Sequence, residues 1–147
     1  MVWIYVLLVV LAGTLIPLQA GINATLRLSA GHPVLAAITN FSVGWAVLVS
    51  YALATRVTLP SAAQLSKAPW WSWIGGMMGA CLVLAGVTLS HRLGAATFVA
   101  LIIVGQLSSS VLLDHFGLVG FEQHSANPMR LLGVALLGLG AYLIRTH

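Results

Sequence analysis

Charged side chains are almost absent from this sequence. Asp, Glu, Lys and Arg together make up 5% of its 147 residues, whereas hydrophobic residues make up 60%. About a quarter of the residues of a soluble domain are charged, so this scarcity, with a mean hydropathy of +1.04, excludes an ordinary soluble protein. We expect a single transmembrane domain over residues 1–147 in contact with the lipid bilayer, since this length leaves no room for a separate soluble module.

Clusters of charge and pairs of cysteines are missing as well. The six Lys and Arg residues are spread singly along the chain, so the sequence has no basic patch for nucleic acid. Cys81 is the only cysteine, which excludes an intrachain disulfide and favours a small apolar role for this residue. The histidines lack metal-ligand spacing, and no pair of carboxylates lies deep in an apolar run. We therefore expect no metal, no cofactor and no catalytic residue.

Long apolar runs are what the sequence does contain. Because MVWIYVLLVV has no Lys or Arg before its apolar stretch, we interpret the first run as a membrane helix and not as a signal peptide. Gly31 and Pro33 separate the first two runs, and SHRLG is expected to form a tight turn before the fourth. Five runs can cross about 30 Å of hydrocarbon, at residues 3–26, 33–54, 70–89, 95–113 and 129–144. The expected fold is an all-α integral membrane protein with five transmembrane helices.

Two of these runs carry a polar stripe, in which polar residues recur at four-residue steps and so share one helix face. In the first run the stripe consists of Gln19, Asn23 and Arg27. In the fourth run it consists of Gln106, Ser110 and Asp114. The stripes therefore predict two helices that turn a polar face toward each other or toward a common space.

The amides of these stripes lie deep in the membrane. Counting along each run places Gln106 within roughly 5 Å of the midplane, and Gln19 and Asn40 within about 5 to 8 Å of it. Arg27 and Asp114 lie near opposite interfaces. One interpretation is that the amides form interhelical hydrogen bonds that stabilise the packing of the helices. The other is that they line a shared cavity that binds a substrate, with the lining Gln19, Asn23, Asn40, Gln106, Ser109 and Ser110.

The third run begins with WWSWIGGMMGA. Its tryptophans are typical of an interfacial aromatic belt. Gly75 and Gly79 form a GxxxG face, with Gly76 beside it, on which another backbone can pack closely. The alternative is that Trp71 or Trp73 lines the path of a substrate.

Several stretches together resemble a known family, namely PLQAGINATLR, FSVGW, WWSWIGGMMGA, LGAATFVALIIVGQLSSSVLLDHFGLVG and RLLGVALLGLG. They look like the YdcZ-type small membrane proteins of the drug/metabolite transporter superfamily, and the match runs nearly end to end. Gln19 with Asn23, and GQLSSSVLLDHFG, are the most specific pieces. The resemblance implies a five-helix bundle similar to one repeat of the ten-helix transporters. It also implies a homodimer in the bacterial inner membrane that acts on a small-molecule substrate.

The first helix departs from the pattern of the small multidrug-resistance transporters of the same superfamily. Those proteins place a carboxylate in this helix to bind protons or cations, whereas Gln19 and Asn23 offer only neutral amides. A neutral polar or anionic substrate therefore fits better. We expect a transporter that alternates access to a midplane cavity at a dimer interface. The alternative is a passive pore or a non-transporting membrane subunit, in which the amides only form interhelical hydrogen bonds that stabilise packing.

Lys and Arg are balanced between the two sides of the membrane. The side that holds the N-terminus receives Arg56, Lys67 and Arg130, and the other side receives Arg27, Arg92 and Arg145. Because the positive-inside rule acts through an imbalance, we expect insertion in both orientations and an antiparallel homodimer, with a parallel dimer as the alternative. In an antiparallel pair, Arg27 of one copy and Asp114 of the other would mark each mouth of the cavity.

Overall fold

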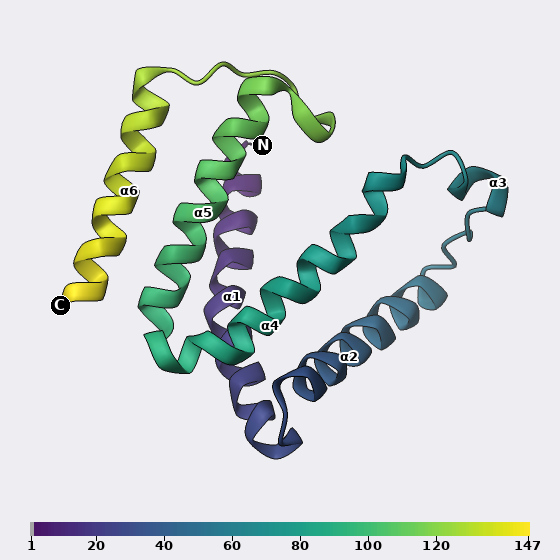
Figure 1. Ribbon diagram of the computed structural model, residues 1–147. Helices are drawn as coiled ribbons and strands as arrows, with labels where there is room; N and C mark the ends of the chain where they lie inside the picture. The colour runs from purple at the N-terminus through teal and green to yellow at the C-terminus, as the bar shows by residue number, and fades with distance from the viewer. Residues whose placement is uncertain (1) are drawn as a thin grey trace. The chain divides into compact units, whose positions relative to one another are not determined.

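A computed structural model describes residues 2–147 as an all-helical chain (Figure 1). Within these residues, five helices are long and apolar enough to cross a membrane, which confirms the predicted number and order. They are α1 (Val2–Ala30), α2 (Pro33–Ala54), the 3-10 turn η1 (Trp70–Ile74) continued by α4 (Gly75–Leu93), α5 (Ala95–Phe116) and α6 (Pro128–Thr146). The short helix α3 (Ala62–Leu65) and the 3-10 turn η2 (Leu118–Gly120) lie in the two longer connections.

Two of the connections, between α1 and α2 and between α4 and α5, are short and depend on glycine and proline. Gly31, with φ of +73°, follows α1, and the ring nitrogen Nδ1 of His32 accepts a hydrogen bond of 3.2 Å from the Val34 amide at the start of α2. The turn between α4 and α5 is shorter than SHRLG suggested, because α4 continues to Leu93 and only Gly94 (φ +81°) breaks the helix. Helix continuation keeps backbone groups hydrogen-bonded at the membrane, and glycine adopts a positive φ without steric cost.

The chain divides into two compact units. The first unit comprises the residues up to Pro17 together with Leu93–His147, and the second comprises Leu18–Arg92. One boundary falls at Pro17, inside α1, where proline cannot donate its hydrogen bond to the helix ladder. The other boundary falls where α4 ends.

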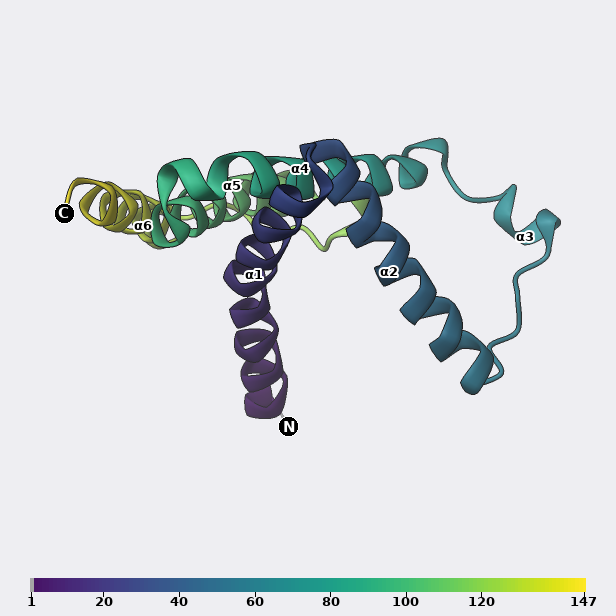
Figure 2. The same ribbon diagram turned by 90° about the horizontal axis from the view of Figure 1, so that it is seen from below.

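The buried residues of the second unit are mostly small. Both ribbon views show α4 crossing the C-terminal half of α1, close to the turn into α2 (Figures 1 and 2). Small residues at such a crossing allow backbones to approach closely, and Val87 is the largest side chain that is fully buried. The buried residues are Ala20, Asn23 and Ala24 of α1, Ala36 and Ala37 of α2, and Gly86, Val87 and Ser90 of α4.

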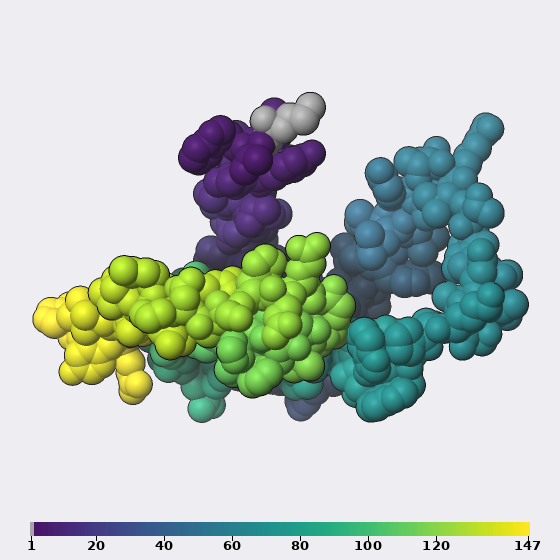
Figure 3. All heavy atoms as spheres, turned by 90° about the horizontal axis from the view of Figure 1, so that it is seen from above, coloured from purple at the N-terminus to yellow at the C-terminus, as the bar shows by residue number. Residues whose placement is uncertain are grey.

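The first unit is built around the hairpin of α5 and α6, which pack side by side (Figure 1). In the space-filling view, the connection between them (green) forms a continuous surface with the start of α6 (Figure 3). The buried residues of the hairpin are Thr97, Phe98, Ala100 and Val111 of α5 and Ala141 of α6.

Most large apolar side chains remain exposed. In none of the five spanning helices is more than 17% of the most apolar stretch buried. Water would make such a surface unfavourable, but a bilayer is itself apolar. The exposed faces are therefore surfaces for acyl chains or for other copies of the chain.

Candidate substrate-binding site

The polar stripe of α1 lies on one face of a continuous helix, as predicted. Gln19, Asn23 and Arg27 follow at single turns within Val2–Ala30. Gln19 is exposed, Asn23 is only 4% exposed, and Arg27 is half-buried. The stripe therefore leads from an open position near Pro17 into the packed part of the second unit.

Asn40 is half-buried on α2, two turns from the start of that helix. The hydroxyls of its neighbours Thr39 and Ser42 each donate a hydrogen bond of 2.9 Å to a carbonyl one turn earlier in the same helix. Those hydroxyl protons are thus used locally. The amide of Asn40 has no equivalent partner within its unit and remains available to another molecule.

The polar stripe of α5 also lies on one face of a continuous helix. Gln106 is exposed, and so are Ser109 and Ser110. Ser108 is different, because its hydroxyl donates a hydrogen bond of 2.7 Å to the Val104 carbonyl. Gln106, Ser109 and Ser110 are therefore the polar side chains that this part of α5 can offer to a ligand.

Among the described residues of either unit, none of the four deep amides takes part in a side-chain hydrogen bond. A primary amide carries two donor protons and an acceptor oxygen, and facing hydrocarbon without partners costs it several kcal/mol. Partners must therefore come from a ligand, from water in a cavity, or from another part of the assembly. Gln106 belongs to the first unit and Gln19, Asn23 and Asn40 to the second, so their convergence in one cavity stays a prediction.

Ser90 of α4 is a buried polar residue that the sequence did not single out. It is 7% exposed, and its hydroxyl oxygen has no hydrogen-bond partner among residues 2–147. A helical serine usually donates to the carbonyl one turn earlier, as Thr88 does to Leu84 at 2.8 Å. An unpaired buried hydroxyl costs about 1–3 kcal/mol. The spacing of Gly86 and Ser90 by one turn, as two small residues, was the only signal in the sequence.

The GxxxG face of α4 is open in the second unit. A Cβ atom added to Gly75 or Gly76 would meet no atom within 4 Å, and one added to Gly79 would meet only the Phe41 ring, at 4.0 Å. The predicted close packing against another backbone is thus not made by the described part of this chain.

An apolar groove of about 530 Å³ lies between α2 and α4. Phe41 and Trp45 line it from α2, and Cys81 and Leu84 line it from α4. Ser42 is its polar lining residue, and the Ser42 hydroxyl is bonded to the Ile38 carbonyl. The groove therefore suits an acyl chain or an apolar side chain and offers little to a polar substrate.

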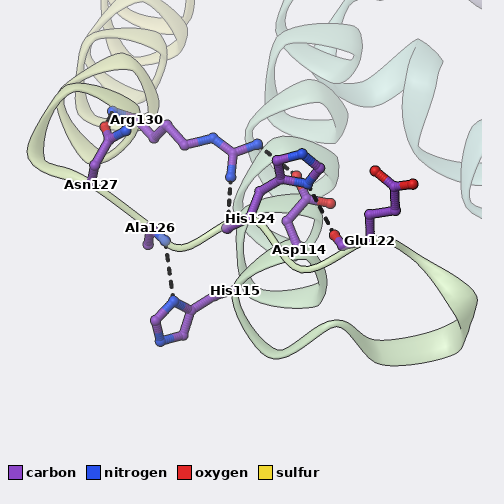
Figure 4. Close-up of polar contacts among 7 residues, drawn as sticks. All are labelled: Asp114, His115, Glu122, His124, Ala126, Asn127 and Arg130. Atoms are coloured by element: carbon purple, nitrogen blue, oxygen red, sulfur yellow. Dashed lines mark hydrogen bonds and ion pairs between the residues drawn. The ribbon is translucent and has the colours of Figure 1, made fainter.

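Asp114 forms an ion pair with Arg130, at 2.6 Å between Oδ2 and Nη2 (Figure 4). The other guanidinium nitrogen of Arg130 donates a hydrogen bond of 3.0 Å to the His124 carbonyl, and the His124 amide donates one of 2.8 Å to the Asp114 carbonyl. The predicted mouth residue Asp114 thus already has a partner in its own chain. The sequence had placed both residues at the ends of consecutive helices on one side of the membrane, but it did not pair them.

Further hydrogen bonds hold the rest of this connection in place. The ring nitrogen Nδ1 of His115 accepts a hydrogen bond of 3.1 Å from the Ala126 amide, and the Gln123 side chain donates one of 3.0 Å to the His115 carbonyl. Asn127 caps α6 by accepting a hydrogen bond of 2.9 Å from the Arg130 amide. Among the residues described, no three His, Cys, Asp or Glu side chains are grouped to hold a metal ion.

Comparison with known proteins covers both polar stripes. The family model DMT_YdcZ, described as "Putative inner membrane exporter, YdcZ", matches residues 4–143. The chain is also similar to the inner membrane protein YdcZ of Escherichia coli (strain K12), with 30% identity over 115 residues that cover 75% of this chain and 73% of that protein. No solved structure matches the chain.

Proposed function

Since this chain belongs to the YdcZ family of inner membrane exporters, we propose that it moves a small polar molecule across the membrane by alternating access to a central cavity. The protein is a multi-pass protein of the bacterial inner membrane. Its transport activity would reside in the polar stripes of α1 and α5 together with Asn40 of α2.

The cavity that we propose is lined by polar side chains of α1, α2 and α5. The observation that carries it is that deep amides on α1, α2 and α5 have no side-chain hydrogen bond within their own units. Such groups are stabilised by a hydrated cavity and by a polar substrate that accepts and donates hydrogen bonds. The substrate-binding residues are Gln19, Asn23, Asn40, Gln106, Ser109 and Ser110.

A second copy completes the transporter that we propose. Five helices make a half-size unit, and the open GxxxG face of Gly75 and Gly79 offers a second backbone a close approach. With Lys and Arg balanced between the two sides, an antiparallel pair gives the inverted repeats that alternating access uses.

Each mouth of such a dimer would carry a net positive charge. Arg27 of one copy would share a mouth with Asp114 of the other, and Asp114 keeps its own Arg130. Two guanidinium groups would thus face one carboxylate. This balance favours anionic or neutral substrates over cations.

Flux through reconstituted liposomes tests the proposed function. A thermal-shift screen of metabolites on the purified protein first identifies a compound that stabilises it, and the flux of this compound is then measured against concentration. We expect saturation, with no flux through protein-free liposomes. Flux that rises linearly would indicate a passive pore. A protein that moves none of the stabilising compounds would be a non-transporting subunit.

A further inference from the structure

We propose that Asn23, Arg27 and Ser90 bind the carboxylate of a small organic anion where α4 crosses α1. This inference rests on the proposed transport function. It deepens that function by naming the substrate class and by adding Ser90 to the binding residues.

Asn23 and Ser90 lie on the buried faces of α1 and α4, two helices of which the described parts cross in the second unit (Figures 1 and 2). Asn23 shares the covered face of α1 with Ala20 and Ala24, and Ser90 shares the covered face of α4 with Gly86 and Val87. All of these residues are buried, and all of them belong to the second unit. The two ribbon views show this part of α4 lying across the C-terminal half of α1 (Figures 1 and 2). Because both faces are buried and the two helices cross, the proposed site takes one polar side chain from each helix.

The hydrogen-bonding state of Ser90 points to a ligand. Its hydroxyl is buried and has no partner in the described chain. Thr88, two residues earlier on the same helix, shows the ordinary alternative, because its hydroxyl donates to the Leu84 carbonyl at 2.8 Å. The amide of Asn23, which is 4% exposed, has no side-chain hydrogen bond within its unit either. Each group thus retains a proton to donate to an acceptor from outside.

The charge of the second unit identifies that acceptor as an anion. The chain has only two acidic residues, Asp114 and Glu122, and both belong to the first unit. Arg27 lies one turn from Asn23 on the same face of α1, is half-buried, and forms no ion pair within residues 2–147. A guanidinium that is partly removed from water is stabilised by a negative partner. Hydroxyl, amide and guanidinium protons all donate to carboxylate oxygens, whereas an uncharged ligand would leave the charge of Arg27 uncompensated.

Calorimetric titration and thermal melting of the purified full-length protein test this site. The probes are acetate, lactate and succinate, each compared with its neutral amide. We expect the acids and not the amides to raise the melting temperature. Ser90→Ala and Arg27→Gln should each weaken binding of the acids by about tenfold or more, since each loses a hydrogen bond to a charged group. Thr88→Val is the matched control and should bind as the wild type does, because the Thr88 hydroxyl is satisfied within its own helix.

The ligand-free protein provides a second measurement. Ser90→Ala should melt at or above the wild-type temperature without ligand, because only an unpaired hydroxyl is removed. A lower melting temperature, or loss of the folded protein in both Ser90→Ala and Ser90→Cys, would show a structural role and overturn the inference.

Several binding results would overturn the inference as well. One is that none of the three acids raises the melting temperature, and another is that acids and amides raise it equally. A third is that Ser90→Ala binds the acids with wild-type affinity, which would show that water satisfies the Ser90 hydroxyl. Saturable flux of a neutral compound without carboxylate binding would overturn the inference alone. Absence of saturable flux for every stabilising compound would instead overturn the proposed transport function, regardless of the results of the carboxylate-binding measurements.

Discussion

Asp114 and Arg130 close the hairpin of α5 and α6 with an ion pair of 2.6 Å. Asp114 lies in the last turn of α5 and Arg130 in the first turn of α6, and their side chains are 24% and 34% exposed. Because consecutive spanning helices end and begin on the same side of a membrane, these two residues can pair within one chain. Arg130 holds Asp114 in place and compensates its charge at the predicted cavity mouth.

Breaking this pair should destabilise the hairpin modestly. Asp114→Asn and Arg130→Gln should each lower the free energy of unfolding by about 1 kcal/mol, since the pair is partly exposed. The double variant should lose little more than either single variant. Equilibrium unfolding in detergent micelles measures all three.

Glu122→Gln is the control for loss of a carboxylate from the same connection. Glu122 is exposed and belongs to no ion pair in the part of the chain that the structure describes, so its free energy of unfolding should change by less than about 0.5 kcal/mol. Strict additivity of the two losses in the Asp114/Arg130 double variant would mean that the pair contributes no coupling energy.

Gly117 should be sensitive to a single added methyl group. It ends α5 with φ of +60°, and a Cβ atom there would lie 3.3 Å from the Gln123 Cβ. Gly117→Ala should therefore lower the free energy of unfolding by about 1–2 kcal/mol. Gly44→Ala in α2 is the control, since a Cβ there meets nothing within 4 Å, and it should be neutral or stabilising by about 0.5–1 kcal/mol. A wild-type melting curve for Gly117→Ala would contradict this account of the connection.

The two exposed glutamines should be essential for transport and dispensable for assembly. Gln19→Leu and Gln106→Leu should abolish saturable flux in liposomes while the proposed dimer, measured by crosslinking and gel filtration, persists. The reason is that each side chain has no hydrogen bond within its unit to lose, but would contact the substrate. Thr25→Val on α1 is the control, because the Thr25 hydroxyl donates to the Gly21 carbonyl at 3.0 Å. Glutamine variants that fail to assemble would favour the interpretation that the amides form interhelical hydrogen bonds that stabilise packing.

The helices were predictable because their signals are local. Pro33 begins α2 and Gly31 precedes it as the sequence indicated, and the spans predicted at 95–113 and 129–144 became α5 and α6 with a few more residues at their ends. An apolar run needs no distant partner to be helical in a bilayer, since all its backbone hydrogen bonds are made within the run.

Side-chain partners were much less predictable, because they depend on how the helices pack. Spacing alone placed Asp114 on the polar face of α5, but its pairing with Arg130 requires the path of the connection between them. Ser90 was expected in the turn SHRLG, whereas in the structure α4 continues through it to Leu93 and Ser90 is buried. Its unpaired hydroxyl follows from that burial and has no trace in the residue pattern.

Insertion in both orientations is the prediction that bears most directly on the dimer. The pairing of Asp114 with Arg130 does not change the balance of three basic residues on each side, because the positive-inside rule counts Lys and Arg and gives acids little weight. A C-terminal alkaline phosphatase fusion, active outside the cytoplasm, and a C-terminal green fluorescent protein fusion, fluorescent inside it, should therefore both give signal.

Two lysines added after His147 should hold the C-terminus in the cytoplasm, and two added in the connection around Lys67 should hold it outside. Each locked variant alone should lose most of its saturable flux, since only one half of an antiparallel pair is made. Coexpression of the two variants should restore the flux. As a control, two glutamines at each site should leave both reporters and the flux unchanged. Full activity of a single locked variant would exclude the antiparallel dimer in favour of a parallel one.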